Sequence, residues 1–295
     1  MGGPARWLVQ PVDLAELAGL LAGLARLEDG PPHEQLPWVV LGGGSNLLVD
    51  DAGYPGVVID LTRGCGSLVR QGATILAGAG VTTRALAHFA RREGLTGAEF
   101  LAGIPGTIGG ALRMNAGAYG GDMARMLEQA EVMDPRGERH RRTPEQLGMG
   151  YRTCNLPADW LFTGAEFRLT PGDPQAIRQR MRELNQRRRQ SQPLEFPSAG
   201  SVFKNPPGTQ AWRLIREAGL AGVRRGRAEI SERHCNFFIN RGGARAADMM
   251  ALMAQARAAV RQRTGVVLEP EVRLLGGPGW VLLESPASSP DRAGG

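Results

Sequence analysis

The sequence predicts an α+β fold with more than one domain, and three features indicate it. The chain has 295 residues, which is enough for two or three domains with a substantial hydrophobic core. A first unit with one helix is followed, from about Cys65, by a stretch dominated by short strands. An arginine-rich helical stretch, stopped by Pro193, then separates the rest of the chain, in which helices and strands mix again.

The elements follow from hydrophobic spacing and from helix-start and helix-stop residues. Apolar residues three or four apart predict a helix over residues 12–27, and a second helix over 82–93 ends at Gly94. A proline-rich loop is expected at 29–37, and a polar, disordered tail at 286–295. Further helices are expected at 175–192, 211–218 and 246–264, and strands at 56–61, 130–134, 161–169, 236–240 and 266–275.

The composition is that of a soluble globular protein. Hydrophobic residues make up 42% and charged residues 22% of the sequence, and no apolar run approaches the roughly 20 residues that span a bilayer. The first ten residues lack the pattern of a secretory signal. The three cysteines are widely spaced and form no CxxC pair, which indicates neither a disulfide framework nor a zinc site. We expect a cytoplasmic protein without a structural metal.

The charge is basic, with a net charge of +6 and a sequence pI near 10. Such a charge is compatible with nucleic acid, a membrane surface or acidic small molecules. The densest arginine groups, 139–142 and 187–189, are not interleaved with aromatic residues as in a nucleic-acid platform. We therefore interpret them as solvated faces and expect no nucleic-acid partner, while an anionic substrate would still be attracted by the positive field.

Residues 101–119, LAGIPGTIGGALRMNAGAY, form the most unusual stretch of the chain. They contain five glycines, a proline and an asparagine, with Arg113 as the one charged residue. Glycine lets a backbone approach a ligand closely, and consecutive N–H groups can form a nest for phosphate or for ring heteroatoms. A simple cluster of turns would have the same composition.

Residues 39–49, VVLGGGSNLLV, have the same character and make a cofactor site the better interpretation. An apolar run leads into Gly42, Gly43 and Gly44 and another follows Asn46, which predicts a strand, a tight turn and a second strand. Neither stretch fits a known nucleotide fingerprint, because no Gly-Lys-Ser/Thr follows the first and the second lacks the G-x-G-x-x-G spacing.

Three other places carry candidate chemistry. Tyr151 and Arg152 lie between predicted strands, where an arginine could hold a carboxylate or simply pair with a surface acid. Lys204, the one lysine in the sequence, lies in PSAGSVFKNP, which also reads as a serine-rich turn. In LEPEVR, alternation predicts that Glu269, Glu271 and Arg273 share one strand face, although a charged edge strand explains that pattern equally well.

These stretches together resemble the UDP-N-acetylenolpyruvoylglucosamine reductases, also called UDP-N-acetylmuramate dehydrogenases. Single motifs would be weak signals, but their joint order up to about Gly276 is specific. The matching segments are GGPA at the start, LGGGSNLLV, GLTGAEFLAGIPGTIGGALRMNAGAYGGD, YR, PSAGSVFKNP, LIREAGL, HCNFFIN and LEPEVRLLG.

The resemblance implies a two-lobed FAD-binding domain of the vanillyl-alcohol-oxidase (PCMH) type, followed by a smaller α+β substrate-binding domain. The expected boundaries are 1–61 and 62–193 for the two lobes and 194–285 for the substrate domain. Family members usually have a lead-in before the GGPA segment, and a serine where this chain has Cys154.

The resemblance also implies the roles of individual residues. Arg152 and Glu271 would stabilise the enolic form of the substrate, and Ser201 would donate a proton to it. Tyr151, Lys204 and Asn205 would contact the substrate. The residues expected to hold FAD without a covalent bond are Gly42, Gly43, Gly44, Ser45, Asn46, Gly103, Ile104, Pro105, Gly106, Thr107, Gly109, Gly110, Asn115, Ala116 and Gly117.

The implied reaction uses NADPH as co-substrate and FAD as hydride carrier to reduce the enolpyruvyl group of a UDP-sugar, in a monomeric protein. No second dinucleotide motif is visible, which agrees with NADPH and the UDP-sugar using one pocket in turn. Two alternatives are an FAD-dependent oxidase of small alcohols on the same scaffold and a non-catalytic, basic nucleotide- or RNA-binding protein. Rapid reoxidation by oxygen would indicate the first, and a colourless protein after flavin reconstitution the second.

Overall fold

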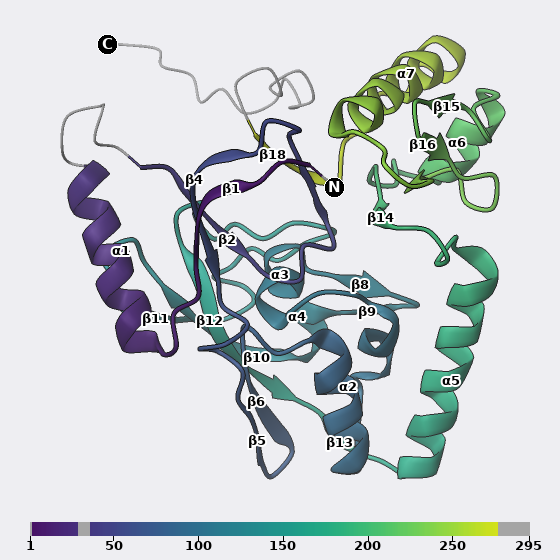
Figure 1. Cartoon of the computed structure of the whole chain (residues 1–295). Coiled ribbons are helices and arrows are strands. Elements are labelled where there is room, and N and C mark those ends of the chain that lie inside the picture. Colours follow the sequence, from purple (N-terminus) through teal and green to yellow (C-terminus); the bar gives the residue numbers. More distant parts are fainter. Residues whose placement is uncertain (1, 29–35, 277–295) are drawn as a thin grey trace, which may run out of the picture. The chain divides into compact units, whose positions relative to one another are not determined.

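The computed structural model describes residues 2–28 and 36–276, which form two compact units (Figure 1). The larger unit contains residues 5–28, 36–45 and 55–190. The smaller unit contains residues 2–4, 46–54 and 191–276. The predicted boundary at 61/62 falls inside the larger unit and stays a prediction, and most of the expected loop at 29–37 and the whole tail at 286–295 lie outside the described residues.

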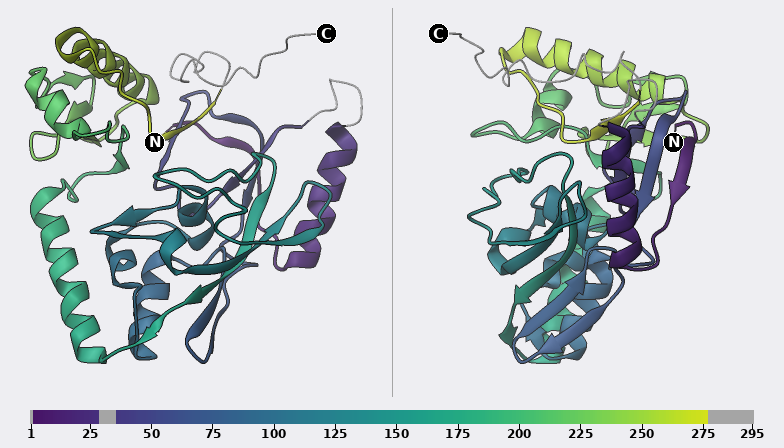
Figure 2. Two further views of the ribbon diagram at one scale, coloured as in Figure 1. Left: turned by 180° about the vertical axis from the view of Figure 1, so that it is seen from behind. Right: turned by 90° about the vertical axis from the view of Figure 1, so that its left-hand side faces the viewer.

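A three-stranded sheet and helix α1 begin the larger unit. The sheet has the order β1 (Ala5–Val9), β4 (Tyr54–Asp60), β2 (Trp38–Leu41), and β2 runs parallel to β4. Helix α1 (Leu14–Glu28) lies beside these strands, as the right-hand view of Figure 2 shows. Its leucines at three- and four-residue spacing, Leu17, Leu21 and Leu24, are buried in the same core as Ile59. The predicted apolar stripe is thus confirmed for these leucines, while Val12 and Leu27 at its two ends are exposed.

An antiparallel sheet of five strands is the centre of the larger unit. Its core side is filled by fully buried side chains, including Ile75, Val132 and Phe167. The strands pair in the order β11 (Arg139–Arg142), β10 (Leu127–Met133), β12 (Leu161–Arg168), β6 (Thr74–Gly78), β5 (Leu68–Gln71).

Short helices and ladders complete the larger unit. Helix α2 (Thr83–Arg92) begins where predicted, because the Thr82 hydroxyl accepts a hydrogen bond from the Ala85 amide at 3.1 Å. The other elements are β7 (Leu95–Thr96), η1 (Glu99–Gly103), α3 (Ile108–Arg113), β8 (Gly117–Ala118), β9 (Gly121–Asp122), α4 (Met123–Met126), β13 (Thr170–Pro171) and α5 (Pro174–Ser191).

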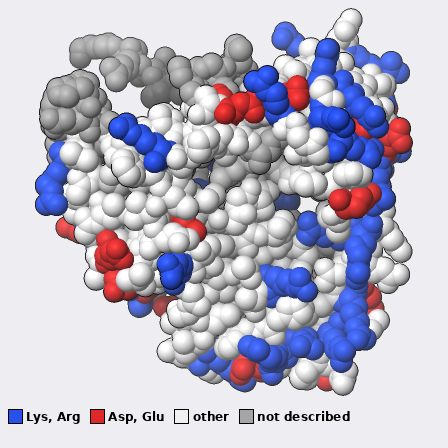
Figure 3. Space-filling model, viewed as in Figure 1, with Lys and Arg blue, Asp and Glu red and all other residues white. Residues whose placement is uncertain are grey.

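Helix α5 has the arginine-rich face that the sequence predicts, although Arg188 on this helix is half-buried. Its buried side is limited to Ile177, Met181 and Leu184. Basic side chains form a continuous band along this helix in Figure 3, and its exposed arginines are Arg178, Arg180, Arg182, Arg187 and Arg189. No helix in the described part of the chain is both long and apolar enough to cross a membrane.

The smaller unit packs helices α6 (Ala211–Glu217) and α7 (Ala246–Thr264) with an antiparallel sheet of four strands. Helix α7 has the predicted bounds and ends at Gly265, whose φ of 74° is the left-handed conformation of a helix C-cap. The sheet order is β14 (Ser198–Ser201), β17 (Phe237–Asn240), β16 (Ala228–Ile230), β15 (Arg224–Arg225).

The predicted strand at 266–275 is wrong over most of its length. Only β18 (Arg273–Leu275) is a strand, and it runs parallel to β3 (Leu47–Val49). That Glu269, Glu271 and Arg273 share one face of this segment stays a prediction. Pro270 has no N–H to donate, and an isolated antiparallel bridge between Pro270 and Phe203 holds the segment instead of a longer ladder.

The buried Asn236 substitutes for a strand partner beside β14. Its Nδ2 donates to the Phe203 carbonyl at 2.7 Å, and the Phe203 amide donates to its Oδ1 at 3.0 Å. Only 2% of Asn236 is exposed. The side chain thus satisfies both polar groups of the Phe203 backbone.

We predict that Asn236→Ala lowers the free energy of unfolding by about 2–5 kcal/mol, because it leaves a buried N–H and a buried C=O without partners. Denaturant unfolding measures this effect. Gln186→Ala, which removes an exposed amide from α5, should change stability little. A similar loss in both variants would contradict the account of Asn236.

Candidate active site

The two glycine-rich stretches lie against each other in the larger unit. A Cβ atom added at Gly43 would lie 2.7 Å from the Gly106 Cα, closer than real Cβ contacts come. The Ser45 hydroxyl donates to the Pro105 carbonyl at 3.1 Å, which ties the stretches together. Segments 60 residues apart thus form one backbone surface in which glycine is required for close approach.

This surface presents several backbone donors. Within residues 2–28 and 36–276, no hydrogen bond uses the amides of Gly43, Gly44, Ser45, Gly106 or Thr107 as donors. Gly106 has a φ of 112°, which L side chains rarely adopt. Two adjoining runs of available N–H groups are the donor set that a diphosphate requires. The residues present therefore fit a dinucleotide cofactor.

The neighbouring glycines serve packing as well. The Gly109 amide donates to the Ala79 carbonyl at 2.9 Å. A Cβ at Gly109 would lie 3.1 Å from the Ala79 Cβ, so glycine lets α3 approach the residue after β6. Gly103 faces the side chains of Asn185 and Arg188. Their flavin contacts remain predictions.

A pocket of about 680 Å³ opens in the larger unit, and the end of the second glycine-rich stretch, including Asn115, Gly117 and Tyr119, forms part of its lining. It lies between the β8–β9 hairpin and residues 144–152. Asn115 joins its two walls, because its Nδ2 donates to the Gly150 carbonyl at 2.8 Å and its Oδ1 accepts from the Ala124 amide at 3.0 Å. Asn115 is 5% exposed. Its side chain therefore has a structural task besides any contact with a cofactor.

Arg152 lines this pocket in a strained conformation. Its φ is 56°, an unusual value for a residue with a side chain. Its Nη2 donates to the Gly117 carbonyl at 2.8 Å, and its guanidinium lies 5.4 Å from the centre of the Tyr151 ring. Burial raises the pKa of the nearby Cys154 thiol, so it stays neutral near pH 7. Cys154 packs against the hydrophobic core of the larger unit.

The smaller unit holds the other predicted site residues. Ser201 ends β14, and the backbone of Lys204 donates to the Glu269 carbonyl at 2.9 Å. The Lys204 ammonium forms an ion pair with the Glu269 carboxylate. Asn205 accepts from the Ala211 amide at 3.0 Å and so caps the start of α6. The capping role of Asn205 was not predicted.

Glu271 is held close to the Ser201 strand. Its amide donates to the carbonyl of Val202, the residue after Ser201, at 2.8 Å. Its own carbonyl accepts from Asn46 Nδ2 at 3.0 Å. The structure thus brings Ser201 and Glu271 onto neighbouring backbone segments of the smaller unit, while Arg152 belongs to the larger unit.

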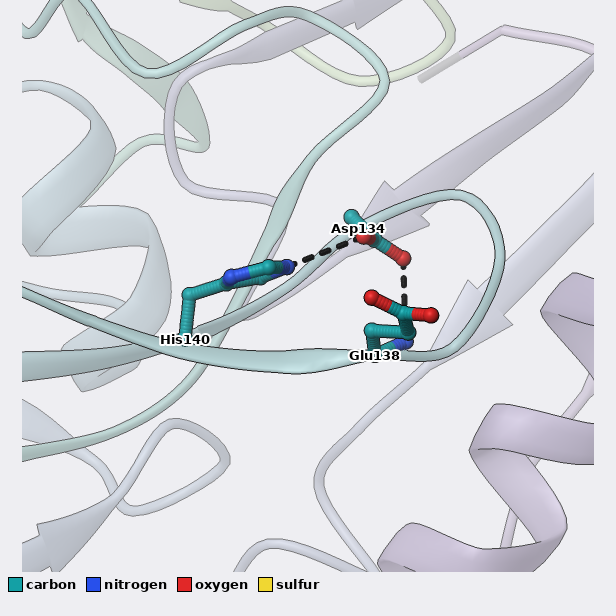
Figure 4. Close-up of side chains that lie close together, drawn as sticks. All are labelled: Asp134, Glu138 and His140. Atoms are coloured by element: carbon teal, nitrogen blue, oxygen red, sulfur yellow. Dashed lines mark hydrogen bonds and ion pairs between the residues drawn. The ribbon is translucent and has the colours of Figure 1, made fainter.

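Asp134, Glu138 and His140 could in principle hold a metal ion, since each has a ligand atom within 4.8 Å of the others. Figure 4 shows them at the turn between β10 and β11. Asp134 Oδ1 accepts from the Arg136 and Glu138 amides, and its Oδ2 is 2.9 Å from His140 Nε2. Burial alone would raise the Asp134 pKa, but these hydrogen bonds lower it overall. These hydrogen bonds stabilise the β10–β11 hairpin, and they account for the closeness of Asp134 to Glu138 and His140 without a metal ion.

Arg113 was also missed by sequence reasoning. Its Nη1 donates to the carbonyls of Leu156 at 2.6 Å and Pro157 at 3.0 Å, and its Nη2 donates to that of Trp160. Its position as the one charged residue of a glycine-rich stretch could have marked it as important. Its role could not be predicted, because its three carbonyl partners are more than 40 residues away in the sequence.

The paired glycine loops and the arginine-lined pocket define a dinucleotide-dependent enzyme with a separate α+β unit. Residues 10–143 match the model of an FAD binding domain. Residues 192–275 match that of the C-terminal domain of UDP-N-acetylenolpyruvoylglucosamine reductase. The class is therefore that of FAD-dependent oxidoreductases.

Individual relatives identify the family. Proteins called UDP-N-acetylenolpyruvoylglucosamine reductase are similar over nearly the whole chain. That of Magnetococcus marinus is 49% identical over 93% of this chain and 88% of its own length, and that of Geobacter metallireducens 49% identical over 94% and 89%. A solved UDP-N-acetylenolpyruvylglucosamine reductase from Thermus caldophilus superposes with a TM-score of 0.78, at 39% identity over 91% of both chains. The chain belongs to the UDP-N-acetylenolpyruvoylglucosamine reductase family.

Proposed function

We propose that this protein reduces UDP-N-acetylglucosamine enolpyruvate to UDP-N-acetylmuramate with NADPH, a step of peptidoglycan precursor synthesis. The observation that carries the proposal is the 49% identity to a reductase of this name over 93% of the chain. The two matched domain models, an FAD binding domain and the reductase C-terminal domain, support it in the same order along the chain.

FAD fits the larger unit. The available amides of Gly43, Gly44, Ser45, Gly106 and Thr107 would hold its diphosphate. Bound there, FAD supplies the redox chemistry that carries a hydride between NADPH and the vinyl carbon of the substrate.

The chain's own residues supply position and charge. Arg152 would hold the enolpyruvyl carboxylate, since a guanidinium is always charged and can donate two parallel hydrogen bonds. Glu271 would stabilise the enolic form, and Ser201 would donate a proton to the adjacent carbon. Tyr151, which lines the pocket, and Lys204 would contact the substrate. Asn205 would contribute through the start of α6, which it caps.

We further propose a cytoplasmic, monomeric enzyme. NADPH and nucleotide sugars are substrates of that compartment, and the reaction as assigned needs no residue from a second subunit. Size-exclusion chromatography with light scattering tests the oligomeric state.

We predict that the recombinant protein is yellow and that acid precipitation releases all of its flavin as FAD. The expected cradle consists of backbone amides, and no residue is recognisably placed for a covalent flavin link. Flavin that stays with the precipitate, or a colourless protein after reconstitution with FAD, would contradict the assignment of the glycine loops.

The paired variants Gly43→Val and Gly72→Val test the same loops. A valine at Gly43 meets the Gly106 backbone at 2.7 Å and should abolish FAD binding. Gly72, unlike Gly43, has a positive φ, of 63°, but nothing lies within 4 Å of a Cβ added there. Its replacement strains the β5–β6 turn and should leave FAD bound.

A further inference from the structure

Asn46 follows the three glycines and Ser45 in the stretch 39–49, and the sequence predicts that it is a flavin ligand. The structure gives its side chain a different partner. Its Nδ2 donates to the Glu271 carbonyl at 3.0 Å, across 225 residues of sequence. Asn46 belongs to the same compact unit as Glu271, whereas the preceding residue, Ser45, belongs to the larger unit.

The position of Asn46 is itself fixed by the smaller unit. Its carbonyl accepts from the Arg273 amide at 2.9 Å. The next residues form β3, which pairs with β18 in parallel register from Leu47 and Arg273 onward. The side-chain amide is therefore presented from an anchored backbone.

The Glu271 carbonyl is bound by a side chain, that of Asn46, because Glu271 follows Pro270 and precedes the β18–β3 ladder, which begins at Arg273. The Glu271 amide donates to the Val202 carbonyl at 2.8 Å, and the Asn46 amide group binds the Glu271 carbonyl. Both peptide groups that flank the Glu271 Cα are thus held, one by the Ser201 strand and the other by Asn46. Together they set the direction in which the Glu271 side chain leaves the backbone.

We propose that Asn46 is a positioning residue for Glu271 and acts in the reduction of the enolpyruvyl substrate. This inference rests on the proposed function. It assigns to a residue of the LGGGSNLLV stretch a task in substrate chemistry that is separate from holding FAD. Without its amide, rotation about the Glu271 backbone is less restricted and the carboxylate is displaced from the substrate.

The test compares Asn46→Ala with wild-type holoenzyme in three measurements. Titration of the apoprotein should give an FAD dissociation constant within about threefold of wild type. Stopped-flow reoxidation by UDP-N-acetylglucosamine enolpyruvate should be about 10- to 100-fold slower, as expected for a misplaced catalytic group. Hydrogen exchange should show lost protection at the Glu271 and Val272 amides, whose acceptor is the Val202 carbonyl.

A double-mutant cycle shows whether Asn46 acts through Glu271. In a Glu271→Ala background, Asn46→Ala should slow reoxidation by less than about twofold further, because the group it positions is absent. Ser45→Ala is the comparison from the same stretch. It breaks the contact with Pro105 and should leave exchange at Glu271 unchanged. If Asn46→Ala does not fold, Asn46→Asp keeps the size but places a carboxylate oxygen against the Glu271 carbonyl, and it should give the same signature with a larger effect.

Two results would overturn the proposal. One is an FAD dissociation constant raised more than about tenfold, with wild-type reoxidation once the variant is saturated with flavin. The other is unchanged exchange at Glu271 or fully additive losses in the cycle. A wild-type enzyme that the enolpyruvyl substrate cannot reoxidise would instead refute the proposed function, and the exchange measurement would still decide whether Asn46 holds Glu271.

Discussion

Arg152→Lys should lower kcat by about 10² or more, although it keeps the positive charge. The Arg152 guanidinium binds the Gly117 carbonyl through Nη2 at 2.8 Å and the Asn115 carbonyl through Nη1 at 3.5 Å. With five N–H donors in its fork, it can still donate to a substrate carboxylate. Lysine has one nitrogen on a flexible stem and cannot do both in a fixed plane. Steady-state kinetics with saturating NADPH and UDP-sugar measures the effect.

Arg139→Lys is the matched control for this variant. Arg139 lies on β11, outside the pocket, and pairs with Glu131 at 3.1 Å on the surface, an interaction worth little to stability. Its replacement should leave kcat and KM nearly unchanged. Turnover of Arg152→Lys within a factor of a few of wild type would mean that Arg152 is not part of the chemistry.

The parts of the fold that were predicted correctly have local causes. Helix α7 could be assigned at 246–264 because apolar spacing, exposed polar residues and the C-terminal Gly265 all act within a few residues. Helix α2 similarly has its own cap in Thr82. Such signals need no knowledge of distant segments.

The error at 266–275 has the opposite cause. Alternation in LEPEVR is typical of a strand, but a strand exists only where a partner supplies the ladder. Here the Glu269 carbonyl and the Glu271 amide bond to residues 204 and 202, and the ladder with β3 begins only at Arg273. Neither partner is visible in the local pattern.

In the candidate site, too, features with local causes were predicted and features that depend on distant segments were not. Glycine content located both loops, but it could not separate Gly43, which faces another backbone, from Gly109, which packs α3 against Ala79. The strands on either side of Gly42–Gly44 were predicted, yet not that β2 joins a sheet of the larger unit and β3 one of the smaller unit. This division gives Asn46 a partner that its own stretch does not indicate.

Ser201→Ala should separate the two halves of the reaction. NADPH should reduce the variant's flavin at nearly the wild-type rate, because hydride transfer needs no proton from the Ser201 hydroxyl. Reoxidation by the enolpyruvyl substrate should slow by about 10² to 10⁴, the contribution of a positioned general acid. Ser201→Cys should recover part of the loss, since a thiol also donates a proton.

Ser198→Ala provides the control within the same strand. Ser198 is an exposed residue of β14, and among the described residues its hydroxyl accepts only a long hydrogen bond of 3.4 Å from the Gly200 amide. Both half-reactions of this variant should proceed at nearly the wild-type rate in stopped-flow measurements. If Ser201→Ala slows both half-reactions equally, or neither, then Ser201 only shapes the end of β14, and the proton must reach the substrate from another group.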